Sequence, residues 1–313
     1  MFPVVGTFVI YYPHLCHTRF ASQDTVRNTA SKDGGGYTPS PTYSRILELS
    51  TALQNQLLPI MAAADQSNIG DVYFLSHGEP VRNEVVLGLG LGDLGTSGLS
   101  RINTNVLNPI VYDFYGFPKR YYQFQFHSRA EPSLQNEVIK ALKEGDVNVS
   151  REDRGLDHGV WIPFRAAFGD EIKFPLVQVS LPASSDPRES IKLGQALSKL
   201  RNQGYSIVTT GHIIHNLRDV FSGKGMPYNE PFMKAISSAL SSSDPIASTL
   251  NLMQQPMYKN AHPTDEHFYP LLVAIGATWP DDKCEVIYQG MVDIYGKDVE
   301  EGGLGWGMWQ WTS

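Results

Sequence analysis

The sequence predicts a single α/β domain with a central, mostly parallel sheet and helices on both faces. Two observations predict it. Short apolar runs rich in β-branched and aromatic residues alternate with stretches whose apolar residues recur at helical spacing. No linker divides the 313 residues, of which 42% are hydrophobic, enough for a large core. We therefore expect residues 1–313 to form one domain, with a mobile Gly-, Ser- and Pro-rich loop at residues 31–42.

The predicted elements follow in chain order. Strands are expected at residues 8–12, 71–75, 174–181, 205–210, 271–277 and 285–288, and the Trp-rich end of the chain is expected to be a packed terminal strand. Helices are expected at residues 44–58 and 132–143, the latter with Leu134, Val138 and Leu142 on one face. A third helix begins after the cap Asp186, with Pro187 at its first position, and reaches about Arg201 before Gly204. Together with its flanking strands it predicts a right-handed parallel crossover.

Charge and cysteine usage exclude several classes of protein. The net charge of −7 and the lack of any basic run argue against a nucleic-acid surface. The two cysteines, Cys16 and Cys284, lie too far apart in the chain to indicate a disulfide framework. No apolar run reaches the roughly 18–20 residues of a membrane helix, and the start of the chain lacks the basic segment of a signal peptide. We expect a soluble, cytoplasmic protein that binds neither nucleic acid nor a membrane.

Histidines gather where predicted strands end. His14 follows strand 8–12, His77 follows strand 71–75, and His212 and His215 follow strand 205–210, while His158 lies in an Asp-His-Gly turn. In open parallel sheets ligands bind beyond the carboxyl ends of the strands, and neutral imidazole is a good ligand for iron and zinc. A single histidine is more often a capping or hydrogen-bonding residue, so this pattern alone leaves a metal site and ordinary structural roles both open.

Five local motifs carry a more specific signal. They are FLSHG at residues 74–78, YDFYGFP at 112–118, GLDHGVWIP at 155–163, HNLR at 215–218 and PTDEHFYPL at 263–271. At these motifs the chain resembles the class III extradiol ring-cleaving dioxygenases, in the branch that includes DOPA 4,5-dioxygenase. The motifs occur in the family's order and cover the chain from about residue 71 to its end. The resemblance implies a single α/β domain, in agreement with the elements above.

The resemblance implies two early metal ligands at strand ends. His77 is one of them, and its place after a helix and a strand matches the second ligand. His14 is then the first ligand, because it directly follows a strand, and His17 is its reserve. If His77 is instead the first ligand, the second is missing.

The resemblance also implies roles for three later histidines. His267 matches the late metal ligand, which is a glutamate in the founding branch and a histidine in the DOPA branch. The neighbouring Glu266 is expected to point away from the metal, by alternation along an extended segment. His215 matches the proton-transfer histidine and is grouped with the metal ligands, and His158 would be a second acid–base or hydrogen-bonding group.

The implied reaction is ring opening of a small aromatic diol, a catechol, by dioxygen at ferrous iron. The resemblance also implies zinc as an alternative occupant of the site in the purified protein, and zinc has no redox chemistry of its own. Two other classes of function stay open. One is a zinc-dependent hydrolase or lyase in which histidines activate water, and the other is a non-enzymatic metal-binding module that keeps the scaffold. Dioxygen consumption with ferrous iron and a catechol separates the first class from the other two.

Overall fold

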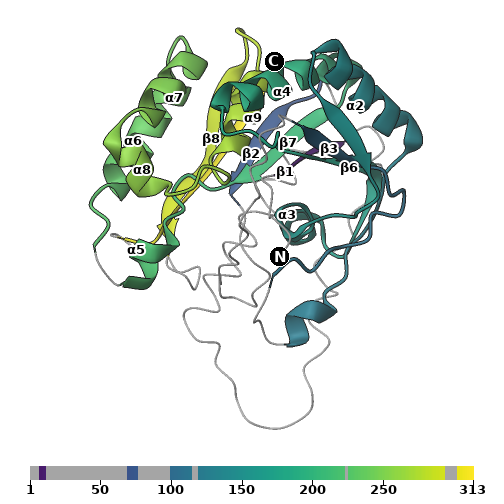
Figure 1. The fold of residues 1–313 in the computed structure, drawn as a ribbon, viewed down its shortest axis with the longest axis horizontal. Helices are drawn as coiled ribbons and strands as arrows, with labels where there is room; N and C mark the ends of the chain where they lie inside the picture. Colours follow the sequence, from purple (N-terminus) through teal and green to yellow (C-terminus); the bar gives the residue numbers. More distant parts are fainter. Residues whose placement is uncertain (1–6, 12–68, 77–98, 115–118, 223–224, 293–301) are drawn as a thin grey trace.

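A computed structural model describes residues 7–11, 69–76, 99–114, 119–222, 225–292 and 302–313 (Figure 1). The predicted helix at 44–58 and loop at 31–42 lie outside these residues. The described chain forms a nine-stranded sheet in the order β5-β3-β6-β1-β7-β2-β9-β8, with β4 paired to β6. The strands are β1 (Thr7–Tyr11), β2 (Val72–Ser76), β3 (Ser100–Asn103), β4 (His127–Arg129), β5 (Val149–Glu152), β6 (Glu171–Ser180), β7 (Ser206–Gly211), β8 (Lys283–Val292) and β9 (Leu304–Thr312).

The α/β class and the single domain are confirmed, but the sheet is mixed rather than mostly parallel. The pairs β2–β7, β3–β5 and β4–β6 are parallel, whereas β1 is antiparallel to both β6 and β7. Strand β9 is antiparallel to both β2 and β8, and β3 is antiparallel to β6. An apolar run indicates that a strand is buried on both faces, but it does not specify the direction of its neighbours, so the sequence pattern could not reveal this mixture.

The connection between β6 and β7 agrees with the sequence in the direction of its two strands, which are parallel to each other. Both strands are antiparallel to β1, so they run in the same direction. They are joined through α4 (Pro187–Ser198) and the 3-10 helix η5 (Lys199–Gln203). Strand β1 lies between them in the sheet, so the two strands are parallel without being neighbours.

Helices cover both faces of the sheet, as predicted (Figure 1). In β2, Val72 and Phe74 pack into the core beneath α2 (Pro132–Glu144), α4 and α9 (Tyr269–Ala277). Tyr73 and Leu75 alternate with them and pack into the core beneath α3 (His158–Phe168). Each such fully buried side chain contributes roughly 1.5–3 kcal/mol to folding. The remaining helices are α5 (Leu217–Ser222), α6 (Asn229–Leu240), α7 (Pro245–Met253), α8 (Pro256–Ala261) and the 3-10 helix η4 (Lys119–Gln123).

Local capping explains where α4 begins and ends. The Asp186 side chain accepts a hydrogen bond from the Arg188 N–H at 3.0 Å, and Pro187 occupies the first turn. Such a cap stabilises a helix by about 1 kcal/mol. After η5, Gly204 adopts a left-handed conformation with φ 82° and ends the helical run. These are the start and stop signals that the sequence showed.

The segment at residues 271–277 is helix α9, so its prediction as a strand was wrong. All nine residues of α9 are buried, and an apolar run that is buried all round has no periodicity that separates a helix from a strand. Helix α9 packs closely against α4, where both helices carry a glycine. A Cβ at Gly194 would lie 2.1 Å from the Val273 carbonyl oxygen, and one at Gly276 would lie 2.4 Å from that of Ile191. The glycines therefore allow the close approach that buries α9.

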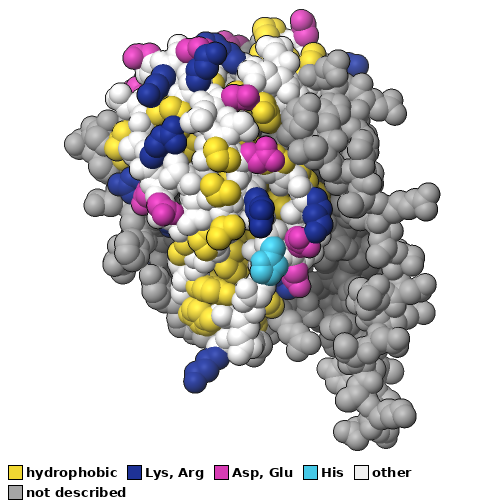
Figure 2. Space-filling view, turned by 90° about the vertical axis from the view of Figure 1, so that its right-hand side faces the viewer, with side chains coloured by type: hydrophobic (Ala, Val, Ile, Leu, Met, Phe, Trp, Pro, Cys, Tyr) yellow, Lys and Arg dark blue, Asp and Glu magenta, His cyan; other side chains and the backbone are white. Residues whose placement is uncertain are grey.

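The described part of the chain contains no helix long and apolar enough to cross a membrane. Figure 2 shows one face of the molecule, on which acidic and basic side chains are interspersed. Exposed ion pairs of the described residues include Lys140–Glu144 at 3.9 Å and Lys192–Asp146 at 3.0 Å. Such exposed pairs contribute little to stability, but their mixture prevents a strong field of one sign over this face.

Candidate functional site

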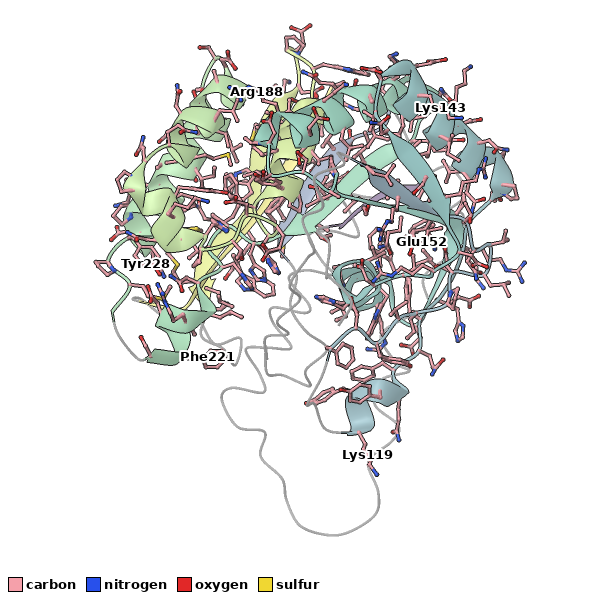
Figure 3. All side chains as sticks on the ribbon, in the orientation of Figure 1. Lys119, Lys143, Glu152, Arg188, Phe221 and Tyr228 are labelled. Carbon is pink, nitrogen blue, oxygen red and sulfur yellow. The ribbon has the colours of Figure 1, made fainter. Side chains whose placement is uncertain are left out.

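The site lies at the edge of the sheet where the parallel strands β2 and β7 end together. Ser76 at the end of β2 pairs with Gly211 at the end of β7. The chain then leads into α5, so this edge faces the end of the molecule marked by Phe221 and Tyr228 (Figure 3). Arg188 and Lys143 mark the other end in the same view. The residues that follow the paired strand ends in the chain are His77, outside the described residues, and His212.

Three buried imidazoles gather at this edge. The rings of His215 and His267 are stacked, with centroids 3.6 Å apart and planes 17° from parallel. The ring of His212 lies 5.4 Å from that of His215 and 5.7 Å from that of His267. All three side chains are buried. The structure thus brings together His215 and His267, two of the four residues that the sequence proposed for the metal site.

Backbone contacts fix where these histidines stand. The His212 N–H donates to the His267 carbonyl oxygen at 2.8 Å, which joins the end of β7 to the segment before α9. A Cβ at Gly211 would lie 2.2 Å from the same oxygen, so this approach requires glycine at the end of β7. The His215 N–H donates to the Ala261 carbonyl oxygen at 2.9 Å. The histidine cluster is therefore held by main-chain bonds between two stretches far apart in the sequence, residues 211–215 and 261–267.

Glu266 points toward the cluster, so the expectation that it points away was wrong. Its Oε1 atom lies 3.0 Å from the Nδ1 atom of His267 and accepts a hydrogen bond from the Thr264 hydroxyl at 2.7 Å. The segment is not extended: the Phe268 N–H donates to the Asp265 carbonyl oxygen at 3.0 Å, which turns the chain into α9. Alternation of side chains therefore does not apply here.

The surroundings of Glu266 keep its carboxylate ionised. Burial raises the pKa of Glu266, but the hydrogen bond and charge of His267 and the Thr264 hydroxyl outweigh burial and lower that pKa to about 2. An ionised carboxylate only accepts hydrogen bonds, so Nδ1 of His267 donates to it. Nε2 of His267 then carries the lone pair that a metal ion requires. Carboxylate partners of this kind commonly orient metal-binding histidines.

The donor atoms of this cluster fit a divalent metal ion. One ligand atom from each of His215, Glu266 and His267 lies within 4.8 Å of the others. Imidazole nitrogen suits iron and zinc, and the Glu266 carboxylate supports such a site as the hydrogen-bond partner of His267. The fit rests on this donor chemistry and on the burial of both histidines.

His158 is the first residue of α3, although the sequence suggested only a turn around it. Its ring nitrogen Nδ1 lies 2.9 Å from Oδ2 of Asp113, and its backbone N–H donates to Oδ1 of the same residue at 3.1 Å. The next residue, Gly159, accepts a hydrogen bond from the Thr210 hydroxyl at 2.7 Å. This bond joins the start of α3 to Thr210 near the end of β7, two residues before His212.

His14 and His77 lie outside the described residues. Tyr11, at the carboxyl end of β1, pairs with Ser206 at the start of β7, because the two strands are antiparallel. The end of β1 therefore lies at the opposite edge of the sheet from Gly211, and the strand-end argument for His14 loses its support from β1. His14 and its reserve His17 stay predictions that metal-binding measurements decide.

Three residues at or beside these histidines have no role that the sequence alone assigned. His212 directly follows β7, as His215 does three residues later, and this position after a strand was the available signal. Asp113 lies in the YDFYGFP motif, but nothing local pairs it with a histidine 45 residues later. Glu266 lies where the chain turns into α9, and its local sequence pattern indicated an extended segment instead.

A fourth histidine, His262, is buried behind the cluster among the rings of Phe232, Tyr258 and Phe268. Its Nε2 atom lies 2.6 Å from the Ile213 carbonyl oxygen, so Nε2 must carry the hydrogen. Its Nδ1 atom has no hydrogen-bond partner among the described residues. Burial lowers the pKa of His262 to about 4, against the opposing effect of the bond to Ile213.

We expect His262 to make the protein sensitive to acid. Its pKa is lower in the folded state, so the unfolded chain takes up the proton first. The stability that His262 supports is complete above about pH 6.5 and is lost as the pH falls to about 4, by about 3 kcal/mol. A His262→Gln variant keeps an N–H donor but does not titrate. Its free energy of unfolding, measured by urea denaturation across this range, should therefore fall less steeply than that of wild type, and equal slopes would contradict the assignment.

Comparisons with known proteins agree with the motifs of the site. The model of the family described as "Catalytic LigB subunit of aromatic ring-opening dioxygenase" matches residues 96–293, more than half of the chain. A "4,5-DOPA dioxygenase extradiol-like protein" of Schizosaccharomyces pombe is 38% identical over 183 residues, covering 54% of this chain and 59% of the relative. The match therefore spans less than two thirds of that relative's length.

Two further matches extend this result. A "4,5-DOPA dioxygenase extradiol" of Beta vulgaris is 34% identical over 192 residues, covering 60% of this chain and 71% of the relative. The crystal structure of an uncharacterized protein from Escherichia coli K12 matches with a TM-score of 0.55 and 21% identity, covering 77% of this chain and 99% of that one. At this identity the structure supports the fold. On the family model and the beet relative together, the chain belongs to the family of the catalytic LigB subunit of aromatic ring-opening dioxygenases.

Proposed function

We propose that this protein is a metal-dependent extradiol dioxygenase that opens the aromatic ring of a catechol-type substrate with dioxygen. The observation that carries the proposal is the convergence of His215, Glu266 and His267 at one edge of the sheet, with ligand atoms within 4.8 Å of one another. Membership of the LigB family supports it, as do the relatives named 4,5-DOPA dioxygenase extradiol.

We propose His267 and His77 as metal ligands, with His215 grouped beside them. Ser76 pairs with Gly211 at the site, and His77 is the next residue in the sequence. His14 is the remaining proposed ligand. These residues would hold ferrous iron, which would supply Lewis acidity together with the redox chemistry that zinc lacks.

The chain's own groups would position the substrate and move its protons. His215 is suited to take a proton from the catechol and return it later, because an imidazole changes its charge near neutral pH. His158 would serve as the second acid–base or hydrogen-bonding group. The burial of His215 and His267 keeps water away from the reacting groups, which strengthens electrostatic interactions there.

Oxygen uptake tests this proposal directly. Metal-free protein should be reloaded with Fe(II) or with Zn(II) and given a catechol under labelled dioxygen. The Fe(II) form should consume one dioxygen per catechol and place both oxygen atoms in a ring-opened product, while the Zn(II) form should consume none. A 1,4-diol isomer, whose oxygens cannot both reach one metal ion, is the matched control substrate. Absence of uptake with ester or amide hydrolysis by the Zn(II) form would instead establish a hydrolase.

A further inference from the structure

We propose that Asp113 is a positioning residue that holds His158 in one tautomer, with Nδ1 protonated, and stabilises the imidazolium form of its ring. This inference rests on the proposed function only for the role of His158 in proton transfer. The contact itself spans 45 residues of sequence and joins the segment after β3 to the start of α3.

Asp113 contacts both the backbone and the ring of His158. Oδ1 accepts the backbone N–H of His158 at 3.1 Å, and Oδ2 lies 2.9 Å from ring atom Nδ1. The two side chains are 3% and 4% exposed, respectively, so water does not compete strongly for either bond. One carboxylate thereby fixes both the first residue of α3 and the rotation of its ring.

The carboxylate is ionised despite its burial. Burial raises the pKa of Asp113, but the charge of His158 and the hydrogen bonds from its ring and backbone outweigh this, so the pKa lies below its ordinary value. An ionised carboxylate can only accept, so Nδ1 of His158 must donate. In the neutral ring the lone pair that can accept a proton is then on Nε2, the nitrogen away from Asp113.

Asp113 also accepts a hydrogen bond from a backbone N–H in the first turn of α3, which the N-cap residue of the helix does not do. Asp157 is the N-cap residue of α3, but its side chain makes no capping bond. Instead, its Oδ2 atom accepts a hydrogen bond from Gln178 at 2.7 Å. Burial and the positive end of a helix both disfavour an imidazolium at the first position. The negative charge of Asp113 opposes both effects.

The other charged groups on the elements packed against α3 have partners elsewhere. Strands β1 and β7 contain no charged residue, and in β6 Glu171 pairs with Lys173 at 2.6 Å on the exposed start of the strand. Arg154 lies 3.9 Å from Asp157. Within α3, Arg165 pairs with Asp170 at 2.7 Å, and the nearby Tyr112 hydroxyl donates to the Phe124 carbonyl oxygen. Asp113 is in direct contact with the His158 ring, with Oδ2 2.9 Å from Nδ1.

The test is an Asp113→Asn variant, which keeps the shape of the side chain and removes its charge. Selective ¹⁵N-histidine NMR of the metal-free protein should show the pKa of His158 falling by roughly 1 to 3 pH units. With Fe(II) and a catechol, kcat should fall about 10²-fold with little change in KM, and the corresponding inflection of the kcat/KM profile should move to lower pH. Asp113→Glu keeps the charge and should restore part of the His158 titration.

A Thr210→Val variant is the matched structural control. It removes the hydroxyl that holds the Gly159 carbonyl oxygen, and so loosens the start of α3 without changing the charge at the ring. The titration of His158 should stay as in wild type. An Asp113→Asn variant whose His158 titrates as in wild type would overturn the proposal. If that variant does not fold, the wild-type spectrum decides, because a His158 ring protonated on Nε2 in its neutral form contradicts it. Absence of oxygen uptake by wild type would remove the proposed function while leaving the NMR result intact.

Discussion

A His215→Gln variant should bind catechol while its oxygen uptake falls by about 10² to 10⁴, the usual contribution of a general acid–base group. Glutamine keeps hydrogen-bonding capacity but cannot carry the proton. The main-chain bond from His215 to Ala261 should survive the change, so the segment before α5 should keep its place. Oxygen-electrode rates and substrate titration by absorbance measure the two halves of this expectation.

The pH dependence of the His215→Gln variant separates proton transfer from binding. The ratio kcat/KM should lose the inflection that belongs to this histidine in the free enzyme. His127→Gln is the matched control, because His127 is exposed on β4 and belongs to no part of the proposed site. Retained activity with an unchanged profile would remove His215 from the mechanism. Loss of the metal would make His215 a ligand, and His158 would become the better candidate for the base.

Replacing His267 or His77 by alanine should remove most of the bound metal, since an open site has few ligands to lose. Metal content after dialysis and Co(II) titration followed by absorbance both report this without any need for activity. Glu266→Gln should weaken metal binding more mildly, by about 10- to 100-fold, because it removes the charge that orients His267 and leaves the ring in place. His127→Ala should bind metal as wild type does.

The same titration decides the first ligand. Loss of metal in His14→Ala but not in His17→Ala would support His14, and the reverse would place the ligand three residues later. Retention in both would show that the segment after β1 is not part of the site, in keeping with the direction of β1. Retention of metal in both His267→Ala and His77→Ala would contradict the proposed site as a whole.

Much of the local structure could be predicted from the sequence because its causes are local. Helices α2 and α4 follow from apolar spacing, and α4 also from the cap at Asp186 and the stop at Gly204. The buried strands β6 and β7 follow from apolar runs between turn residues. The candidate histidines His215 and His267 follow from short motifs, whose residues need only a few neighbours in the chain to be recognised.

The sequence by itself determined the α/β class, the capped helices and the candidate histidines. Only the tertiary structure decided that β1 runs antiparallel to β7, that the apolar segment of α9 is a helix packed against Gly194, and that Asp113 meets His158. It also turned Glu266 toward His267. The physical reason is that these features depend on contacts between residues distant in the chain, where burial and hydrogen bonding override the local preference of a segment.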